Sequence, residues 1–252
     1  MASKPKLKSE HWSRWQAVRT QSVSSRIVDQ VRGALFRGEL KSGDFLGSEN
    51  DLAQKLGVSR VPVRDAFKTL QALGIIEVKL GANGGAWIAF GNPGRFADAL
   101  AVQFKLVGVS VEEMFDSQIA IEVMATELAA KRATDVDLRQ LRDLLGELQV
   151  MCLKPLTRSA ALRFTELSMR FHEALVDAAH NRALVAQFKA LRLVLEPIYA
   201  RRTTDAIAKR VVASHKAVLD SIAAGDAERA CALMRRRLQV IRAHQLMKTV
   251  GR

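Results

Sequence analysis

The N-terminal third of the chain shows a helical spacing of apolar residues in three separate segments. In residues 26–37, Ile27 and Val31 lie about one helical turn apart, and a glycine follows where a left-handed cap can end a helix. A second helix is expected after Ser48, which can cap an acidic first turn, and a third is expected from Ser59 onward. The pattern therefore predicts two helices, a turn and a third helix.

Two strand-like runs follow these helices. Residues 75–80 and 86–90 are rich in β-branched and aromatic side chains, and the glycine-rich segment 81–85 between them is a hairpin signal. The whole N-terminal segment is thus expected to fold as three helices followed by a hairpin. Residues 91–95, with the order Gly-Asn-Pro-Gly-Arg, are typical of a linker.

Beyond this linker the pattern becomes helical throughout. Apolar residues recur at helical spacing and no strand-like alternation is sustained, which predicts a bundle of six or seven helices over residues 96–247. The expected segments are 96–107, 111–132, 135–153, 158–179, 182–202, 205–224 and 226–247. The fold class is therefore mainly α, with a small β hairpin in the N-terminal part.

Composition adds information about partners. The chain has 252 residues, 48% of them hydrophobic, and a formal net charge of +13, which fits a folded protein with a polyanionic partner. Residues 1–20 form a basic tail that contains Trp12 and Trp15, and residues 248–252 form a second short tail. Two distant cysteines exclude a disulfide framework. No uncharged apolar run approaches the roughly 18 residues that span a bilayer, so we expect a cytoplasmic protein without a membrane partner.

The third helix carries two opposed faces. At about 100° per residue, apolar positions share one side, and the basic residues Arg60, Arg64 and Lys68 lie on another. The apolar side comprises Val63, Ala66, Phe67, Leu70 and Leu73. Such a helix fits the major groove, where an arginine can form a forked pair with guanine. A basic stripe of this kind can also be a solvated face with no partner.

The residues around this helix resemble a known family. The segment GELKSGDFLGSENDLAQKLGVSRVPVRDAFKTLQALGIIEVKLGANGGAWI resembles the winged helix-turn-helix of GntR-family transcription regulators, over about residues 26–88. The resemblance implies a DNA-binding domain at residues 21–90, in which Arg60 and Arg64 contact an operator together with the wing. Asn50 stands where the family often has arginine, so sequence specificity can differ. The candidate DNA-binding residues are Ser48, Asn50, Ser59, Arg60, Arg64, Lys68, Asn83, Gly84 and Gly85.

The helical part resembles the FCD effector domain of the FadR-like subfamily, over about residues 96–247. The resemblance rests on Glu122, on the run Phe-His-Glu-Ala-Leu at 171–175, and on the run His-Lys-Ala-Val-Leu at 215–219. It implies a domain that dimerises and binds a small effector. The residues that match or replace the family's pocket positions are Gln118, Ser168, His172, His215 and Arg237.

Many such domains hold a metal with one aspartate and three histidines. Here only His172 and His215 match, because Ser168 replaces the aspartate and Arg237 replaces the last histidine. Two imidazoles beside a guanidinium bind a divalent ion poorly, so we expect no metal cofactor, with zinc as a less favoured alternative. Arg237 can instead bind a carboxylate or a phosphate. Gln118 stands where the family often has arginine, which leaves an uncharged polar ligand as an alternative. The alternative is that Arg237 faces water and the two histidines are core residues.

These observations favour a homodimeric, ligand-responsive transcription repressor whose partners are a double-stranded DNA operator and a small effector, expected to be a carboxylate. An enzyme is not expected, because no phosphate-binding glycine loop or nucleophile motif occurs. Two alternatives remain at this point: a metalloenzyme built on a helical bundle, and a protein that binds DNA without sequence preference.

Overall fold

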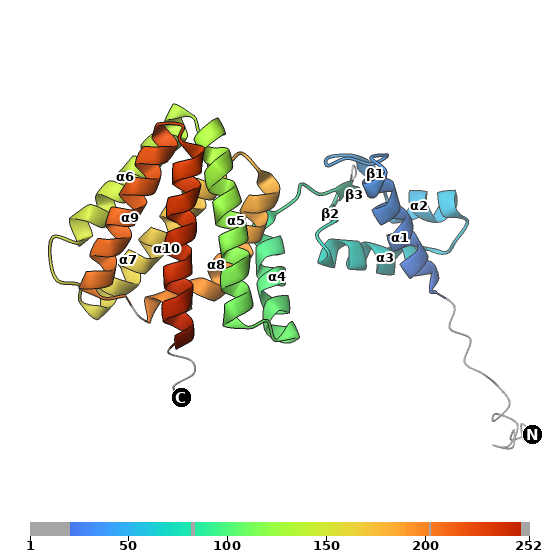
Figure 1. Cartoon of the computed structure of the whole chain (residues 1–252). Helices are drawn as coiled ribbons and strands as arrows, with labels where there is room; N and C mark the ends of the chain where they lie inside the picture. Colours follow the sequence, from blue (N-terminus) through green and yellow to red (C-terminus); the bar gives the residue numbers. More distant parts are fainter. Residues whose placement is uncertain (1–20, 82–83, 202, 248–252) are drawn as a thin grey trace, which may run out of the picture. The chain divides into compact units, whose positions relative to one another are not determined.

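The computed structural model describes residues 21–81, 84–201 and 203–247. The chain divides into two compact units, and the division falls between Gly91 and Asn92. The basic tail, with Trp12 and Trp15, lies outside the described residues, and so does the wing residue Asn83. The observed elements confirm the predicted mainly α fold class, with a small sheet in the N-terminal unit (Figure 1).

In its described residues, the N-terminal unit consists of three helices and a three-stranded sheet. Its elements are α1 (Val23–Phe36), β1 (Phe45–Gly47), α2 (Glu49–Leu56), α3 (Arg60–Ala72), β2 (Ile76–Lys79) and β3 (Gly85–Ile88). The strand order is β1-β3-β2, and both pairings are antiparallel. β1 was not expected from the sequence, because three residues are too few to show a period-2 alternation.

The core of this unit lies under the apolar side of α3. Val63, Ala66, Phe67 and Leu70 are buried, as the helical spacing predicted. Leu73 was also expected in this core, but it is 58% exposed. Leu73 is the cap residue of α3, which ends at Ala72. Its amide still donates to the carbonyl oxygen of Thr69 at 3.0 Å, but no further turn of α3 follows to cover its side chain.

The C-terminal unit contains seven helices in the part that the structure describes. They are α4 (Pro93–Val107), α5 (Val111–Arg132), α6 (Asp135–Met151), α7 (Arg158–Asp177), α8 (Arg182–Ala200), α9 (Asp205–Ala223) and α10 (Ala227–Met247). The expected linker at 91–95 is shorter than predicted, because α4 already begins at Pro93 with Asn92 as its cap. Proline is tolerated there, since the first helical turn has no internal partner for its amide groups.

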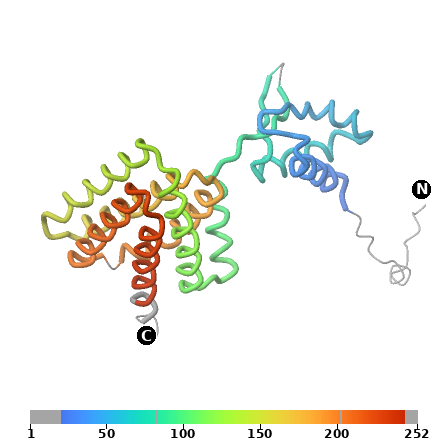
Figure 2. Tube along the Cα trace, turned by 45° about the horizontal axis from the view of Figure 1, so that its top comes forward, coloured from blue at the N-terminus to red at the C-terminus, as the bar shows by residue number. Residues whose placement is uncertain are grey.

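Segments distant in sequence pack together in this bundle. α10 lies beside α5 and α9, and α8 contacts α4 and α7 (Figures 1 and 2). The centre of the unit holds four fully buried phenylalanines, at positions 115, 164, 171 and 188. Within the described residues, no helix is both long and apolar enough to cross a membrane.

Candidate functional site

The two helices of the candidate DNA-binding motif are fixed by local interactions. Ser48 caps α2, because its hydroxyl accepts from the amide of Asp51 at 3.2 Å while Asp51 Oδ2 accepts from the amide of Ser48 at 2.8 Å. Gly57 ends α2 with φ 64°, a left-handed conformation that glycine adopts without strain. Ser59 is the cap residue directly before α3. Its side chain makes no cap hydrogen bond, so its hydroxyl stays available to an outside partner.

The basic face of α3 projects away from the core. The side chains of Arg60, Arg64 and Lys68 are 57%, 54% and 71% exposed. Both arginines lie close to the carboxylate of Glu49 at the start of α2, and Lys68 lies 3.8 Å from Asp65. Asn50 is also exposed. The predicted basic residues therefore share one accessible surface, with the apolar residues of α3 on its opposite side.

The wing glycines serve the fold of the hairpin. The amide of Gly84 donates to the carbonyl oxygen of Gly81 at 2.8 Å, so this amide is already bonded inside the turn. Gly85 has φ 151°, and a Cβ there would lie 2.7 Å from the ring of Phe45. The amide of Gly84 is therefore not free to donate to a phosphate, and a contact between the wing and DNA through other groups stays a prediction. Glycine is required at position 84 because a side chain there would collide with the backbone of the turn.

A cavity of about 870 Å³ lies inside the C-terminal unit. Four of the five predicted effector residues line it, namely Gln118, Ser168, His172 and Arg237, and the fifth, His215, lies directly behind Ser168. Hydroxyl groups and arginines make up most of its polar lining. These residues are Thr165, Tyr199, Thr203, Thr204, Ser214, Arg201, Arg210 and Arg236.

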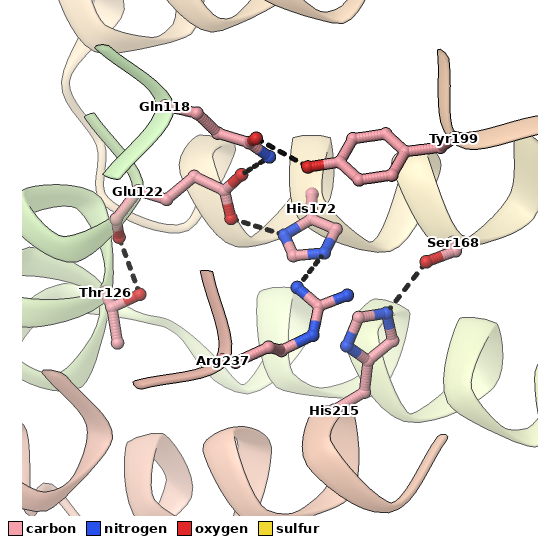
Figure 3. Close-up of polar contacts among 8 residues, drawn as sticks. All are labelled: Gln118, Glu122, Thr126, Ser168, His172, Tyr199, His215 and Arg237. Atoms are coloured by element: carbon pink, nitrogen blue, oxygen red, sulfur yellow. Dashed lines mark hydrogen bonds and ion pairs between the residues drawn. The ribbon is translucent and has the colours of Figure 1, made fainter. Parts of the chain in front are cut away.

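A chain of hydrogen bonds runs across one wall of this cavity (Figure 3). The hydroxyl of Tyr199 donates to Gln118 Oε1 at 2.7 Å, and Gln118 Nε2 donates to Glu122 Oε1 at 2.5 Å. The second oxygen of Glu122 lies 2.5 Å from His172 Nδ1. His172 Nε2 is in turn 2.7 Å from Arg237 Nη1. The chain thus joins α5, α7, α8 and α10.

The partners of His172 determine its protonation. A guanidinium can only donate, so Nε2 must accept from Arg237, and the proton resides on Nδ1, which donates to Glu122. His172 is therefore neutral. This agrees with the lowered pKa of His172, for which burial is the main cause and the nearby positive charge of Arg237 a further one.

Glu122 supplies the negative charge of the site. Its side chain is fully buried, which raises its pKa, but His172, Arg237 and Gln118 outweigh this effect and the pKa of Glu122 is lowered overall. Burial likewise lowers the pKa of Arg237, and the charge of Glu122 raises it. The buried wall therefore holds an ionised carboxylate and a guanidinium, separated by a neutral imidazole.

His215 lies beside this chain. Its Nε2 is 3.1 Å from the hydroxyl of Ser168, and its ring stacks on Phe171 with centroids 4.2 Å apart. Burial lowers the pKa of His215 well below 6.5, and the positive charge of Arg237 adds to this effect. The imidazole is therefore neutral. The alternative of a water-facing Arg237 does not hold, since its guanidinium points to His172 across the cavity wall (Figure 3).

The residues present do not fit a metal ion. The nitrogen that would coordinate an ion, His172 Nε2, already accepts from Arg237, whose charge repels a cation. Ser168 offers no carboxylate. Among the described residues, no group of three or more histidine, cysteine, aspartate or glutamate side chains is placed to hold a metal.

Several residues in the cavity or in the wall behind it were not identified as site residues from the sequence. Glu122 was used only to support a resemblance, although it follows Gln118 by four positions and so shares its helix face. Tyr199 carries a signal that could have been noticed, because it is the only tyrosine of the chain. Burial raises the pKa of Tyr199 above its ordinary value, so its hydroxyl stays protonated and acts as a hydrogen-bond donor. No sequence pattern indicated that Arg201 and Arg210 would line the cavity.

Comparison with known proteins settles the family. The family model for bacterial regulatory proteins of the GntR family matches residues 23–83, and the FCD domain model matches residues 113–240, about half of the chain. The chain belongs to the GntR family, with an FCD effector domain. This GntR regulator is therefore a transcription regulator and not an enzyme, as the sequence predicted, and neither alternative function gains support.

Relatives of known name agree with this assignment. The regulator is 28% identical over 203 residues to the HTH-type transcriptional regulator LutR of Bacillus subtilis, covering 78% of this chain and 89% of LutR. It is 27% identical over 217 residues to the galactonate operon transcriptional repressor of Escherichia coli, covering 84% of this chain and 91% of the repressor. The solved structure of Streptococcus agalactiae GntR has the same fold, with a TM-score of 0.58 at 19% identity, covering 88% of this chain and all of that one.

Proposed function

We propose that this GntR regulator is a homodimeric, cytoplasmic repressor that reads an operator with α3 and responds to a hydroxycarboxylate in the FCD cavity. The observation that carries the proposal is the contrast between two sets of arginines. Arg60 and Arg64 are exposed on one helix face, whereas Arg237 faces an internal cavity. The first set suits a large polyanion, and the second suits a small anion.

The DNA side of the proposal rests on the geometry of α3. A recognition helix enters the major groove with its N-terminal half toward the bases, and that half carries Arg60 and Arg64. Ser59, with its free hydroxyl at the start of the helix, is placed to bond a phosphate. Two such heads in a dimer would bind the two halves of an inverted repeat.

The chemistry of the cavity favours an anionic ligand that carries hydroxyl groups. Four arginines line it, and no carboxylate occurs among the described lining residues. Arg237 spends one donor on His172 and keeps others for a carboxylate, because a guanidinium has five. The serine, threonine and tyrosine hydroxyls can bond a polyol chain. One relative is named as the repressor of a galactonate operon, and galactonate is a ligand of this class.

Ligand binding can affect the bundle through the same hydrogen bonds. A carboxylate on Arg237 would compete with His172 for the guanidinium, and the chain from His172 leads through Glu122 and Gln118 to Tyr199 on α8. α8 packs against α4, the first helix of the FCD unit. A ligand drives release from DNA only if it binds two conformations with different affinity.

Selection of an operator from random double-stranded DNA, followed by titration of variants, tests the DNA side. Arg60→Ala and Arg64→Ala should each weaken binding to the selected sequence by about 1–3 kcal/mol, because each removes a forked base contact. Arg32→Ala, at an exposed position of α1, is the control for loss of one positive charge. If Arg60→Ala and Arg64→Ala lose no more affinity than Arg32→Ala, α3 is not the recognition helix.

Thermal unfolding with D-galactonate and a panel of related hydroxycarboxylates tests the effector side. A ligand present at 100 times its Kd should stabilise the FCD unit by about 2.7 kcal/mol. Arg237→Gln should abolish the stabilisation, because glutamine cannot bind a carboxylate through charge. Equal stabilisation of Arg237→Gln and the unaltered protein would show that the ligand binds elsewhere.

A further inference from the structure

One carboxylate lies between the two arginines of the candidate recognition helix. Glu49 is the first residue of α2, and its oxygens lie 3.1 and 3.2 Å from Arg64 Nε and 3.1 Å from Arg64 Nη2. Its Oε2 also lies 3.6 Å from Arg60 Nη2. The side chain of Glu49 is 27% exposed, about half the value of either arginine. A single acidic group therefore contacts both residues expected to read bases.

The contact uses one particular edge of the Arg64 guanidinium. A guanidinium can form a forked pair through the edge of Nε and Nη2, or through the edge of Nη1 and Nη2. Glu49 lies against Nε and Nη2. An N–H of Nη1 and the second N–H of Nη2 remain available as donors. The spacing between these two donors matches the spacing between O6 and N7 of guanine. Glu49 can thus stay in place while Arg64 pairs with a base.

We propose that Glu49 is a positioning residue that gives this regulator its sequence specificity, by holding Arg64 and Arg60 for base contacts and away from phosphates. The proposal rests on the proposed function, in which these arginines read the operator. It adds a role for an acidic residue on α2 that touches no base itself.

Two physical effects act in the same direction. A free arginine loses side-chain entropy on binding, and a partner that fixes it beforehand removes part of this cost. Contacts to phosphates carry no sequence information, and an ionised carboxylate beside the guanidinium repels phosphate. The hydrogen bond from Arg64 lowers the pKa of Glu49, so the carboxylate is ionised at neutral pH.

A purely structural role explains Glu49 less well. An exposed ion pair contributes little to stability, and so does an acidic residue in a first helical turn. Asp51 already supplies the capping box of α2. The position of Glu49 between two functional side chains is therefore better explained by its effect on those side chains.

Glu49→Gln and Glu39→Gln form a matched pair for the test. Each removes one negative charge from the same unit, but Glu39 pairs with Arg37, away from α3. We would measure the affinity of each variant for the selected operator and for random DNA between 50 and 200 mM salt, and confirm folding by thermal unfolding. In Glu39→Gln both affinities should rise together, with an unchanged ratio.

For Glu49→Gln the ratio of operator to random affinity should fall by about tenfold, through weaker operator binding and stronger, more salt-dependent binding to random DNA. An unchanged ratio, or tighter operator binding, overturns the proposal, because Glu49 would then be neutral or a competitor of DNA. If Arg64→Ala loses specificity and Glu49→Gln does not, this proposal alone fails. If the unaltered protein selects no sequence, the proposed function fails with it.

Discussion

The two units use arginine in opposite ways. On α3, Arg60 and Arg64 are more than half exposed, and Glu49 pairs with them at the surface. In the FCD unit, Arg237 faces a cavity and its charge is balanced by Glu122, which is fully buried, through a neutral histidine. An exposed arginine can exchange its partner for a phosphate or base at little cost, whereas a partly buried one such as Arg237 requires a fixed partner in the free protein.

This difference predicts where substitutions will affect stability and where they will affect binding. Changes at the exposed arginines should alter DNA affinity and leave folding nearly unchanged. Changes in the buried wall of the cavity should mainly lower the free energy of unfolding.

The largest effect is expected for Glu122→Ala. This change removes the negative charge opposite Arg237 and leaves a guanidinium without compensation, which should lower the free energy of unfolding of the FCD unit by about 3 kcal/mol. Calorimetry would measure the loss. Glu127→Ala is the control on the same helix, because Glu127 pairs with Lys131 at the surface and should cost less than about 1 kcal/mol. Equal losses for both variants would show that the buried wall carries no charge pair.

A smaller effect is expected from pH. His172 and His215 have lowered pKa values in the folded protein, whereas in the unfolded chain both titrate near 6.5. Below that pH the unfolded chain binds more protons, so stability is complete above pH 6.5 and falls as pH decreases, by up to about 1.4 kcal/mol per pH unit for each histidine. Denaturant unfolding between pH 7.5 and 5.5 measures this slope. His215→Gln should reduce it, and an unchanged slope would contradict the neutral buried imidazole.

The smallest effect distinguishes two serines that precede helices in the DNA-binding unit. Ser48→Ala should cost about 1 kcal/mol of stability, because it removes the cap of α2. Ser59→Ala should cost much less, since Ser59 makes no cap bond, and should instead weaken DNA binding. Thermal unfolding and DNA titration of both variants would measure the two effects. The reverse order of stabilities would show that the two caps are assigned wrongly.

The sequence predicted those features that depend on local pattern. Helical spacing identified the buried side of α3, and residues such as Ser48 and Gly57 marked helix ends through chemistry that acts within a few residues. β1 was missed because three residues carry no period, and Leu73 was misplaced because helical spacing does not show where a helix stops.

The cavity could be predicted only in part. Resemblance to the family indicated His172, His215 and Arg237, but not the hydrogen bonds that join them. Tyr199 and Gln118 are 81 positions apart in the chain, and their bond depends on how α5 and α8 pack. No periodicity within a single helix contains that information.

The central claim is that Arg64 serves DNA binding and Arg237 serves effector binding. The most direct test is a DNA titration without effector, in which Arg64→Ala and Arg237→Gln are both measured on the selected operator. The account predicts that Arg64→Ala loses about 5- to 150-fold in affinity, whereas Arg237→Gln stays within about twofold of the unaltered protein. Retained affinity in Arg64→Ala, or a comparable loss in a folded Arg237→Gln, would contradict it.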